Sequence, residues 1–236
     1  MGERGEMATV ELIRTEPAYT IAQAARIAGT APQNVRNWLF GSQREGRAMK
    51  PVFGAKEHEG GVYRLSFLEL AELIVVARYR NGSGATMPLQ RLRDAHAYAR
   101  TSMSIPYPFA SGLFKVEGGH IIHRFDEEHP GRAIAVDLGG MFVLPWEMDD
   151  ALSLFDFDET TEQLAQRWYP AGRDVPIVLQ PGYGAGRPVI AGRNVRASVI
   201  VARFRAGMDI DTIMDDYQLD RRTVEAAIRA RDIAAA

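Results

Sequence analysis

Two groups of polar side chains in the first fifty residues have the chemistry for contact with DNA. Amide and guanidinium groups form paired hydrogen bonds with base edges, whereas single basic side chains bind phosphates. The side chains suited to base contact are Gln33, Asn34, Arg36 and Asn37. The side chains suited to phosphate contact are Arg44, Arg47 and Lys50. Because residues 20–50 hold five basic side chains and one acid, we expect a local positive field there.

A third basic group lies near the end of the chain. It consists of five arginines in a stretch that has no acidic residue: Arg187, Arg193, Arg196, Arg203 and Arg205. A guanidinium can pair with a carboxylate of a partner protein or with a phosphate of DNA. The sequence leaves both partners open, and Arg203 and Arg205 also fit the solvated face of a helix.

Composition limits the class of protein. The chain has 236 residues, of which 46% are apolar and 25% charged, with a net charge of −2, as in ordinary globular proteins. It has no cysteine, which excludes disulfides, thiolate-bound metals and a cysteine nucleophile. No apolar run is long enough for a membrane span, and the first ten residues lack the apolar centre of a secretion signal. We therefore expect a cytoplasmic protein with no membrane partner.

Three other patterns are weak signals for catalysis or a bound cofactor. His120 and His123 would point to opposite faces of a strand, so we expect no metal site there. The loop over 181–186 has three glycines but lacks the Gly-Lys-Ser/Thr ending of a phosphate loop. Acidic residues over 126–159 could form a site that cleaves nucleic acid, but no nucleophile or base accompanies them. We expect no enzyme activity, no cofactor and no metal.

Two short helices are predicted to position the first group of side chains. One spans residues 21–29 and begins after Thr20, a good N-cap; the other runs from about 32 to 40. Ala25 fits the position where two helices cross, and Gly29 fits the turn between them. This arrangement predicts a helix-turn-helix that leaves the amide and guanidinium side chains of the second helix facing outward.

A small β-hairpin and two further helices are predicted to follow. A polar loop leads to two extended runs over 51–55 and 62–65, which we expect to pair as a hairpin. Ser66 and Glu69 form a capping box that opens a strongly apolar helix, and Pro88 begins another helix. This order of elements is typical of a winged DNA-binding domain.

The stretch YTIAQAARIAGTAP, over residues 19–32, resembles the DNA-binding start of MerR-type regulators. The resemblance covers residues 19 to about 100 and implies a winged helix-turn-helix that reads an operator. The chain differs from that family at Ala31, where a capping side chain is usual, and over 37–39, where the family has an aromatic pair.

The middle of the chain is acidic and rich in predicted strands. Residues 104–180 carry 13 acidic and 5 basic side chains. Alternating runs over 113–116, 121–124, 133–138 and 141–144 predict strands joined by glycine-containing turns. A short acidic helix is predicted over about 160–168.

The last part is predicted to contain two strands followed by three helices. The strands lie over 175–179 and 188–190, and the helices over about 197–206, 211–217 and 221–234. Asp209 and Asp220 are suited to cap the second and third helices. The segment GRPVIAGRNV, over 186–195, together with the helices after it, resembles a bacterial family of antitoxin-like proteins encoded beside PIN-type toxins. From the residues alone, a three-helix oligomerisation module without DNA contact remains an equal alternative.

The sequence predicts an α+β, mainly helical fold in four parts. These are an N-terminal tail over 1–18, a winged helix-turn-helix domain over 19–103, an acidic β-rich module over 104–175 and a C-terminal helical domain over 176–236. We expect a homodimer, because operator palindromy mirrors a two-fold axis of the protein. The seam would be the helix after Ser66, the helix after Pro88 or the C-terminal helices.

The two resemblances together imply a VapB-type antitoxin of a type II toxin–antitoxin pair. Such a protein would neutralise a PIN-type ribonuclease toxin, for which the five C-terminal arginines are the expected contacts. It would also bind operator DNA and repress its own operon. The alternative is a free-standing MerR-like transcriptional regulator whose middle module binds an effector. A toxin-like reading frame next to the gene would favour the antitoxin.

Overall fold

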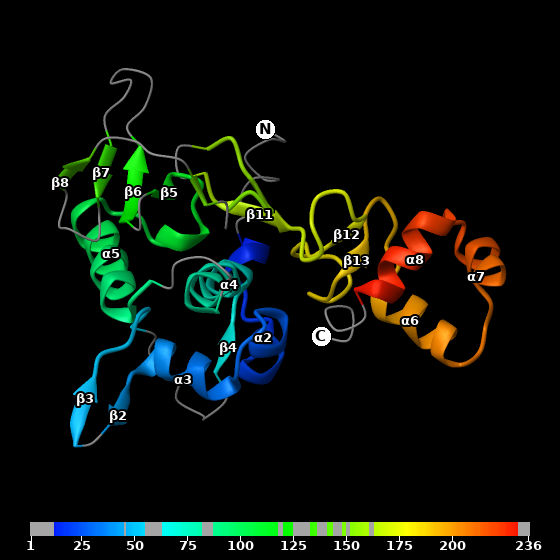
Figure 1. Cartoon of the computed structure of the whole chain (residues 1–236), viewed down its shortest axis with the longest axis horizontal. Helices are drawn as coiled ribbons and strands as arrows, with labels where there is room; N and C mark the ends of the chain where they lie inside the picture. The colour runs from blue at the N-terminus through cyan, green and yellow to red at the C-terminus, as the bar shows by residue number, and fades with distance from the viewer. Residues whose placement is uncertain are drawn as a thin grey trace.

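The computed structural model describes residues 12–44, 46–54, 63–81, 87–117, 120–124, 133–135, 141–143, 148–149, 152–160 and 163–230. These residues form a mixed helical and β structure, as the sequence predicts. Figure 1 shows a larger body that contains the N-terminal helices and most of the strands, and a smaller helical body at the other end of the long axis. Among the described helices, none is long and apolar enough to cross a membrane.

The first two helices form where the sequence places them. Strand β1 (Tyr19–Thr20) leads directly into α2 (Ile21–Ile27), and α3 (Pro32–Phe40) follows after a short turn. Thr20 and Gln23 form a reciprocal capping box: the Gln23 backbone N–H donates to Thr20 Oγ1 at 3.2 Å, and Gln23 Oε1 accepts from the Thr20 N–H at 3.0 Å. Ala25 is buried and Gly29 has a φ of +65°, as expected for the crossing and the turn.

The predicted hairpin is wrong in its position. The hairpin is formed by β2 (Ser42–Arg44) and β3 (Arg47–Met49), inside the stretch that the sequence predicted as a polar loop. Strand β4 (Arg64–Leu65) pairs instead with β1. All three residues of β3 are exposed. Because the strand has no buried face, its sequence lacks the alternation of apolar and polar residues that predicts a half-buried strand.

Helix α4 is the centre of the larger body. It spans Phe67–Asn81 and begins at the predicted capping box, in which the Ser66 N–H donates to Glu69 Oε2 at 2.7 Å. Nearly every side chain of the helix from Phe67 to Ala77 is buried, and the helix contacts α2, β4 and β11. Helix α5 (Leu89–Ser102) and the short 3-10 helix η1 (Pro108–Ala110) belong to the same apolar core.

The strands predicted in the middle of the chain form one antiparallel sheet. Their order is β8-β7-β6-β5-β9, so successive strands from β5 to β8 are neighbours. The bounds of the five strands are Phe114–Glu117, His120–Arg124, Ala133–Ala135, Met141–Val143 and Met148–Asp149 for β5 to β9. The predicted glycine turns between them lie outside the described residues.

The helix predicted over 160–168 is also wrong. Strand β11 (Ala165–Trp168) pairs antiparallel with β10 (Phe155–Phe157), and Ala165 and Trp168 are buried in the core of the larger body. The turn before β11 is fixed by Asp158, whose Oδ1 accepts from the backbone N–H groups of Thr160 and Leu164. The pairing with β10 and the burial of Ala165 and Trp168 outweigh the helix-forming tendency of the segment.

The C-terminal elements have a second apolar core of their own. Strands β12 (Ile177–Val178) and β13 (Val189–Ile190) pair antiparallel and are followed by α6 (Ala197–Arg205), α7 (Ile210–Tyr217) and α8 (Arg221–Arg229). The members of this core include Ile177, Ile200 and Val224. As predicted, Asp209 and Asp220 cap α7 and α8, and each accepts a hydrogen bond from the backbone N–H three residues later.

Candidate functional site

Helix α3 has one buried face and one polar, solvent-exposed face. Val35, Trp38 and Leu39 pack into the core. Gln33, Asn34 and Arg36 are exposed and Asn37 is half-buried. The four side chains predicted to contact base edges therefore lie on the accessible side of the second helix.

All three amide side chains on this face already take part in hydrogen bonds in the free protein. Gln33 Nε2 donates to Asn37 Oδ1 at 2.9 Å, one helical turn further along. Asn34 Nδ2 donates to Thr30 Oγ1 at 3.1 Å, in the turn before α3. These exposed bonds hold the amides in place and can be exchanged for bonds to a ligand at little net cost.

The hairpin carries the residues predicted to contact phosphates. Arg44 and Arg47 are register partners next to its turn, where Gly46 has a φ of +77°. Arg47 and Lys50 are exposed, and the side chain of Arg44 lies outside the described part of the chain. Figure 1 shows that α3 and the hairpin follow one another at the same end of the larger body.

Gly41 sets the angle between α3 and the hairpin. Its φ is +86° and its ψ −176°, a conformation that is accessible almost only to glycine. A Cβ atom at this position would lie 2.6 Å from the carbonyl oxygen of Met49 on β3. The close approach brings the hairpin against the end of the helix.

Two arginines of α5, which the sequence did not indicate, hold the base of the hairpin. Arg93 Nε donates to the carbonyl oxygen of Lys50 at 2.6 Å, and Arg100 Nη1 donates to that of Phe53 at 3.4 Å. The N–H groups of Val52 and Phe53 both donate to the Trp38 carbonyl oxygen. Because these contacts join residues far apart in sequence, no local pattern could have predicted them.

The five C-terminal arginines are not gathered into one patch. Arg187, Arg193 and Arg196 precede α6, whereas Arg203 and Arg205 lie in its last turn. Helix α6 has nine residues and is therefore about 13 Å long, so the first three arginines and the last two lie toward its opposite ends. Arg203 Nε donates to the Tyr217 hydroxyl at 3.2 Å, and this hydrogen bond raises the pKa of Arg203. Arg187, Arg193 and Arg205 are exposed, and Arg196 is half-buried at the N-cap of α6.

Of the acidic residues over 126–159, Asp156 and Asp158 belong to structural ion pairs. Asp156 Oδ1 pairs with Arg173 at 2.8 Å, and its Oδ2 accepts from the Tyr169 hydroxyl at 2.7 Å. Burial acts to raise the pKa of Asp156, but these hydrogen bonds outweigh it and the pKa is lowered. The side chains of His120 and His123 lie outside the described residues, as do residues 126–129. Among the described residues, no three acidic or histidine side chains gather as a metal site would need.

The glycine-rich loop over 181–186 packs against the N-terminal part of the chain. Gly184 has a φ of +57°, and a Cβ there would lie 2.5 Å from Val189 Cγ1. A Cβ on Gly186 would lie 3.0 Å from the Tyr19 hydroxyl oxygen on β1. The glycines therefore allow tight turns and close packing between the two bodies.

Comparisons with known proteins find a family of unknown function and a protein named as an antitoxin. Residues 177–229 match a family described as "Protein of unknown function (DUF433)". The chain is 26% identical over 223 residues to a Mycobacterium tuberculosis protein named "Putative antitoxin VapB45", covering 88% of this chain and 91% of that protein. The crystal structure of Rv2018 from Mycobacterium tuberculosis has the same fold, with a TM-score of 0.63, 23% identity and coverage of 91% of this chain and 99% of that one. The chain is thus similar over nearly its whole length to a protein named as an antitoxin.

Proposed function

We propose that this chain is the antitoxin of a type II toxin–antitoxin pair. In this proposal it binds and neutralises a PIN-type ribonuclease toxin and also binds operator DNA to repress its own operon. The observation that carries the proposal is the similarity to a named antitoxin across 88% of the chain. A shared C-terminal segment alone would leave the role of the larger body open, whereas the similarity extends through both bodies.

The proposed DNA-binding surface consists of the outer face of α3 and the hairpin. It is supported by the exposure of Gln33, Asn34 and Arg36 on one helix face and by the basic residues next to the hairpin turn. In a winged helix-turn-helix of the MerR type, such a helix enters the major groove and the hairpin reaches the neighbouring phosphates. The hydrogen bonds from α5 to the base of the hairpin support this function by fixing its position.

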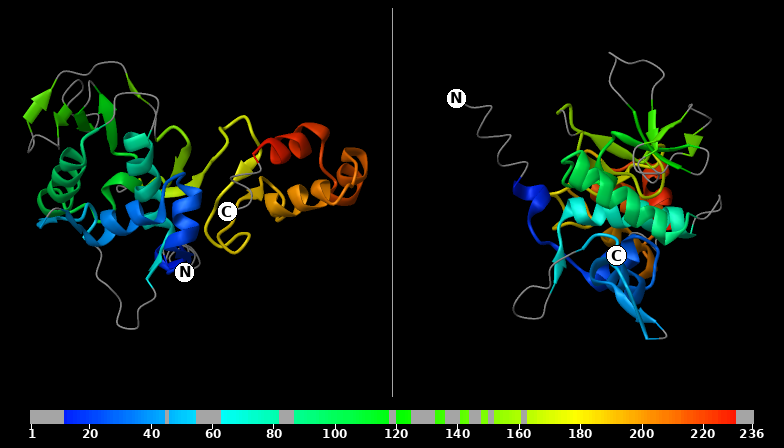
Figure 2. Two further views of the ribbon diagram at one scale, coloured as in Figure 1. Left: turned by 60° about the horizontal axis from the view of Figure 1, so that its bottom comes forward. Right: turned by 90° about the vertical axis from the view of Figure 1, so that its left-hand side faces the viewer.

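The proposed toxin-binding surface is on the smaller body. Its candidate cations are the four arginines whose side chains form no hydrogen bond or ion pair with another described residue, namely Arg187, Arg193, Arg196 and Arg205. A guanidinium can satisfy the clustered carboxylates of a metal-dependent ribonuclease site. Figure 2 shows this body at the opposite end from the hairpin, so both partners can bind the same chain.

We further propose that the protein acts as a homodimer. Helix α4, one of the three predicted seams, is buried within a single chain and has almost no free apolar face. The remaining seams are the outer face of α5 and the C-terminal helices. Sedimentation at tens of micromolar tests this proposal, because a monomer both alone and on DNA would contradict it.

Co-expression with the product of the adjacent toxin-like gene tests the proposed function. An antitoxin should co-purify with that product, and the complex should bind DNA from upstream of the two genes. The variant with alanine at Gln33, Asn34, Arg36 and Asn37 should retain the toxin and lose the upstream DNA. A free-standing regulator would bind the DNA but would not retain the neighbouring product.

A further inference from the structure

A pocket lies where the β-rich part of the larger body meets the strands of the smaller body. Its volume is about 540 Å³, within the range that holds small molecules. Its walls come from β11, from β12 and β13, and from the connection between β13 and α6. Of the residues that line it, the functions proposed above use Arg193, as a candidate toxin contact.

The residues that line the pocket include two arginines, Arg167 and Arg193, and no acidic residue. Gln180 Oε1 accepts from Arg167 Nε at 3.0 Å, which orients this guanidinium. Arg167 Nη1 also forms an ion pair with Asp156 Oδ2 at 3.9 Å, so part of its charge is already balanced. Arg193 is exposed, and its side chain forms no hydrogen bond or ion pair with any other described residue. The charge of the pocket therefore favours an anion.

The remaining walls are apolar and aromatic. Val178, Val189 and Ile190 are buried and contribute to the lining. Tyr169 and Tyr183 add two rings, and Tyr183 is 49% exposed. Such walls fit the flat or aliphatic body of an organic molecule better than an inorganic ion or an extended nucleic acid backbone.

We propose that this pocket binds a small organic anion, with a carboxylate or phosphate head between Arg167 and Arg193 and an aromatic or aliphatic body against the tyrosines. Guanidinium groups accept either head in a bidentate geometry. Asn194, which also lines the pocket, is a further polar residue at the site. This site is separate from operator binding and is present in the chain without any partner.

Isothermal titration of the full chain with three matched probes tests the proposal. Phenylacetate and phenyl phosphate carry the two anionic heads, and phenylacetamide is the neutral counterpart. At least one anion should bind tenfold or more tightly than the amide, and the tighter of the two identifies the head group. Absence of binding at millimolar concentration, or equal binding of the amide, would overturn the proposal.

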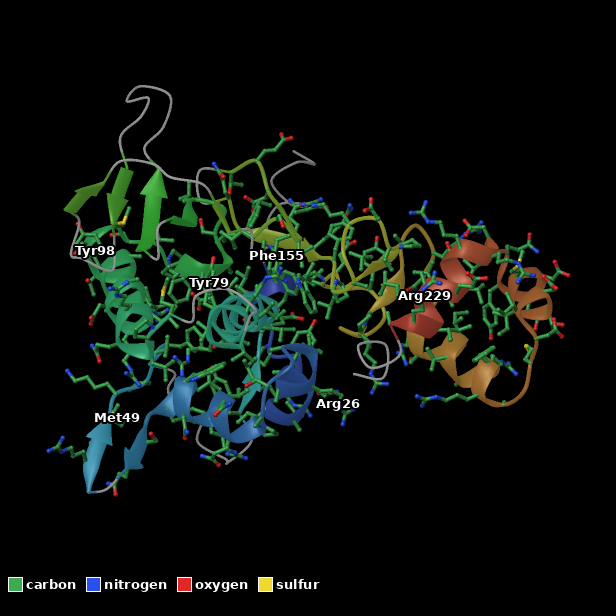
Figure 3. All side chains as sticks on the ribbon, viewed as in Figure 1. Arg26, Met49, Tyr79, Tyr98, Phe155 and Arg229 are labelled. Atoms are coloured by element: carbon green, nitrogen blue, oxygen red, sulfur yellow. The ribbon has the colours of Figure 1, made fainter. Side chains whose placement is uncertain are left out.

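Three single variants locate the bound anion. Arg193→Gln and Tyr183→Ala should each weaken the tighter anion at least fivefold, the first by removing charge and the second by removing the ring. Arg229→Gln removes the same charge from α8, outside the pocket, and should leave affinity within twofold; Figure 3 labels Arg229. Circular dichroism verifies folding of each variant. Unchanged affinity for the anion in both pocket variants would contradict the proposal.

Discussion

The ion pair between Arg14 and Asp158 offers a sharp test of how the larger body is held together. Arg14 Nη1 lies 2.6 Å from Asp158 Oδ2, and the two side chains are only 8% and 7% exposed. The pair joins the short helical segment before β1 to the turn before β11. Replacement of Asp158 by asparagine would leave a buried guanidinium facing an amide that cannot neutralise it.

The expected cost follows from the partners that remain. Loss of one member of a buried ion pair costs about 3–5 kcal/mol, and we expect Asp158→Asn in this range. Arg14→Met leaves Asp158 with the donors of Thr160 and Leu164, so its cost should be smaller, about 1–3 kcal/mol. It also removes the Arg14 Nε atom, which is buried without a hydrogen-bond partner among the described residues.

Urea unfolding of the full chain measures both losses, with the double variant completing a thermodynamic cycle. The double variant should lose less free energy of unfolding than the sum of the two single variants, because its asparagine no longer faces a buried charge. A loss below about 1 kcal/mol for Asp158→Asn would refute the reasoning, since buried pairs cost more when broken. So would a greater loss for Arg14→Met than for Asp158→Asn.

Three further predictions concern pH, the hairpin and DNA. Burial acts to raise the pKa of Asp158, but the Thr160 hydrogen bonds and the Arg14 guanidinium outweigh it and the pKa is lowered. The stabilising effect of Asp158 should therefore be complete above the ordinary aspartate pKa of about 3.9 and should fade as the pH falls through the lowered value. The difference in free energy of unfolding between Asp158→Asn and the native chain should then be smaller at pH 3 than at pH 7, and an equal difference would contradict this. Gly41→Ala places a Cβ 2.6 Å from the Met49 carbonyl oxygen and should lower upstream-DNA affinity in fluorescence anisotropy. Gly29→Ala, at a φ of +65° and with no atom within 4 Å of its Cβ, is the control for replacing a positive-φ glycine without a clash. Arg36→Ala should weaken upstream DNA more than random DNA by about 1–3 kcal/mol, whereas Arg47→Ala should weaken both alike and reduce the salt slope by about 1; equal effects of Arg36→Ala on both DNAs would argue against base contact.

Local signals in the sequence predicted most of the helices. Thr20 with Gln23 and Ser66 with Glu69 form capping boxes, and Asp209 and Asp220 are caps whose backbone partners lie three residues away. Each of these contacts is determined within one helical turn, so a single sequence contains the information. The polar face of α3 could be predicted for the same reason, because helical periodicity separates Val35 and Trp38 from Arg36.

The errors occurred where partners are distant in sequence or the pattern is weak. Strand β4 pairs with β1, more than forty residues earlier, and nothing local distinguishes this partner from a nearer run. Segment 160–168 contains good helix formers, yet Asp158 and Arg14 fix a turn that leads into β11. The pocket around Arg167 and Arg193 could not be predicted either, because its walls come together only in the fold.

Inhibition of the neighbouring gene's ribonuclease by this chain tests the central proposal most directly. The purified toxin should cleave RNA in the presence of Mg²⁺ and lose that activity when one equivalent of the full chain is added. A variant with glutamate at Arg187, Arg193 and Arg205 should fail to inhibit while it still binds upstream DNA. Undiminished cleavage in the presence of excess native chain would contradict the proposal that this protein is an antitoxin.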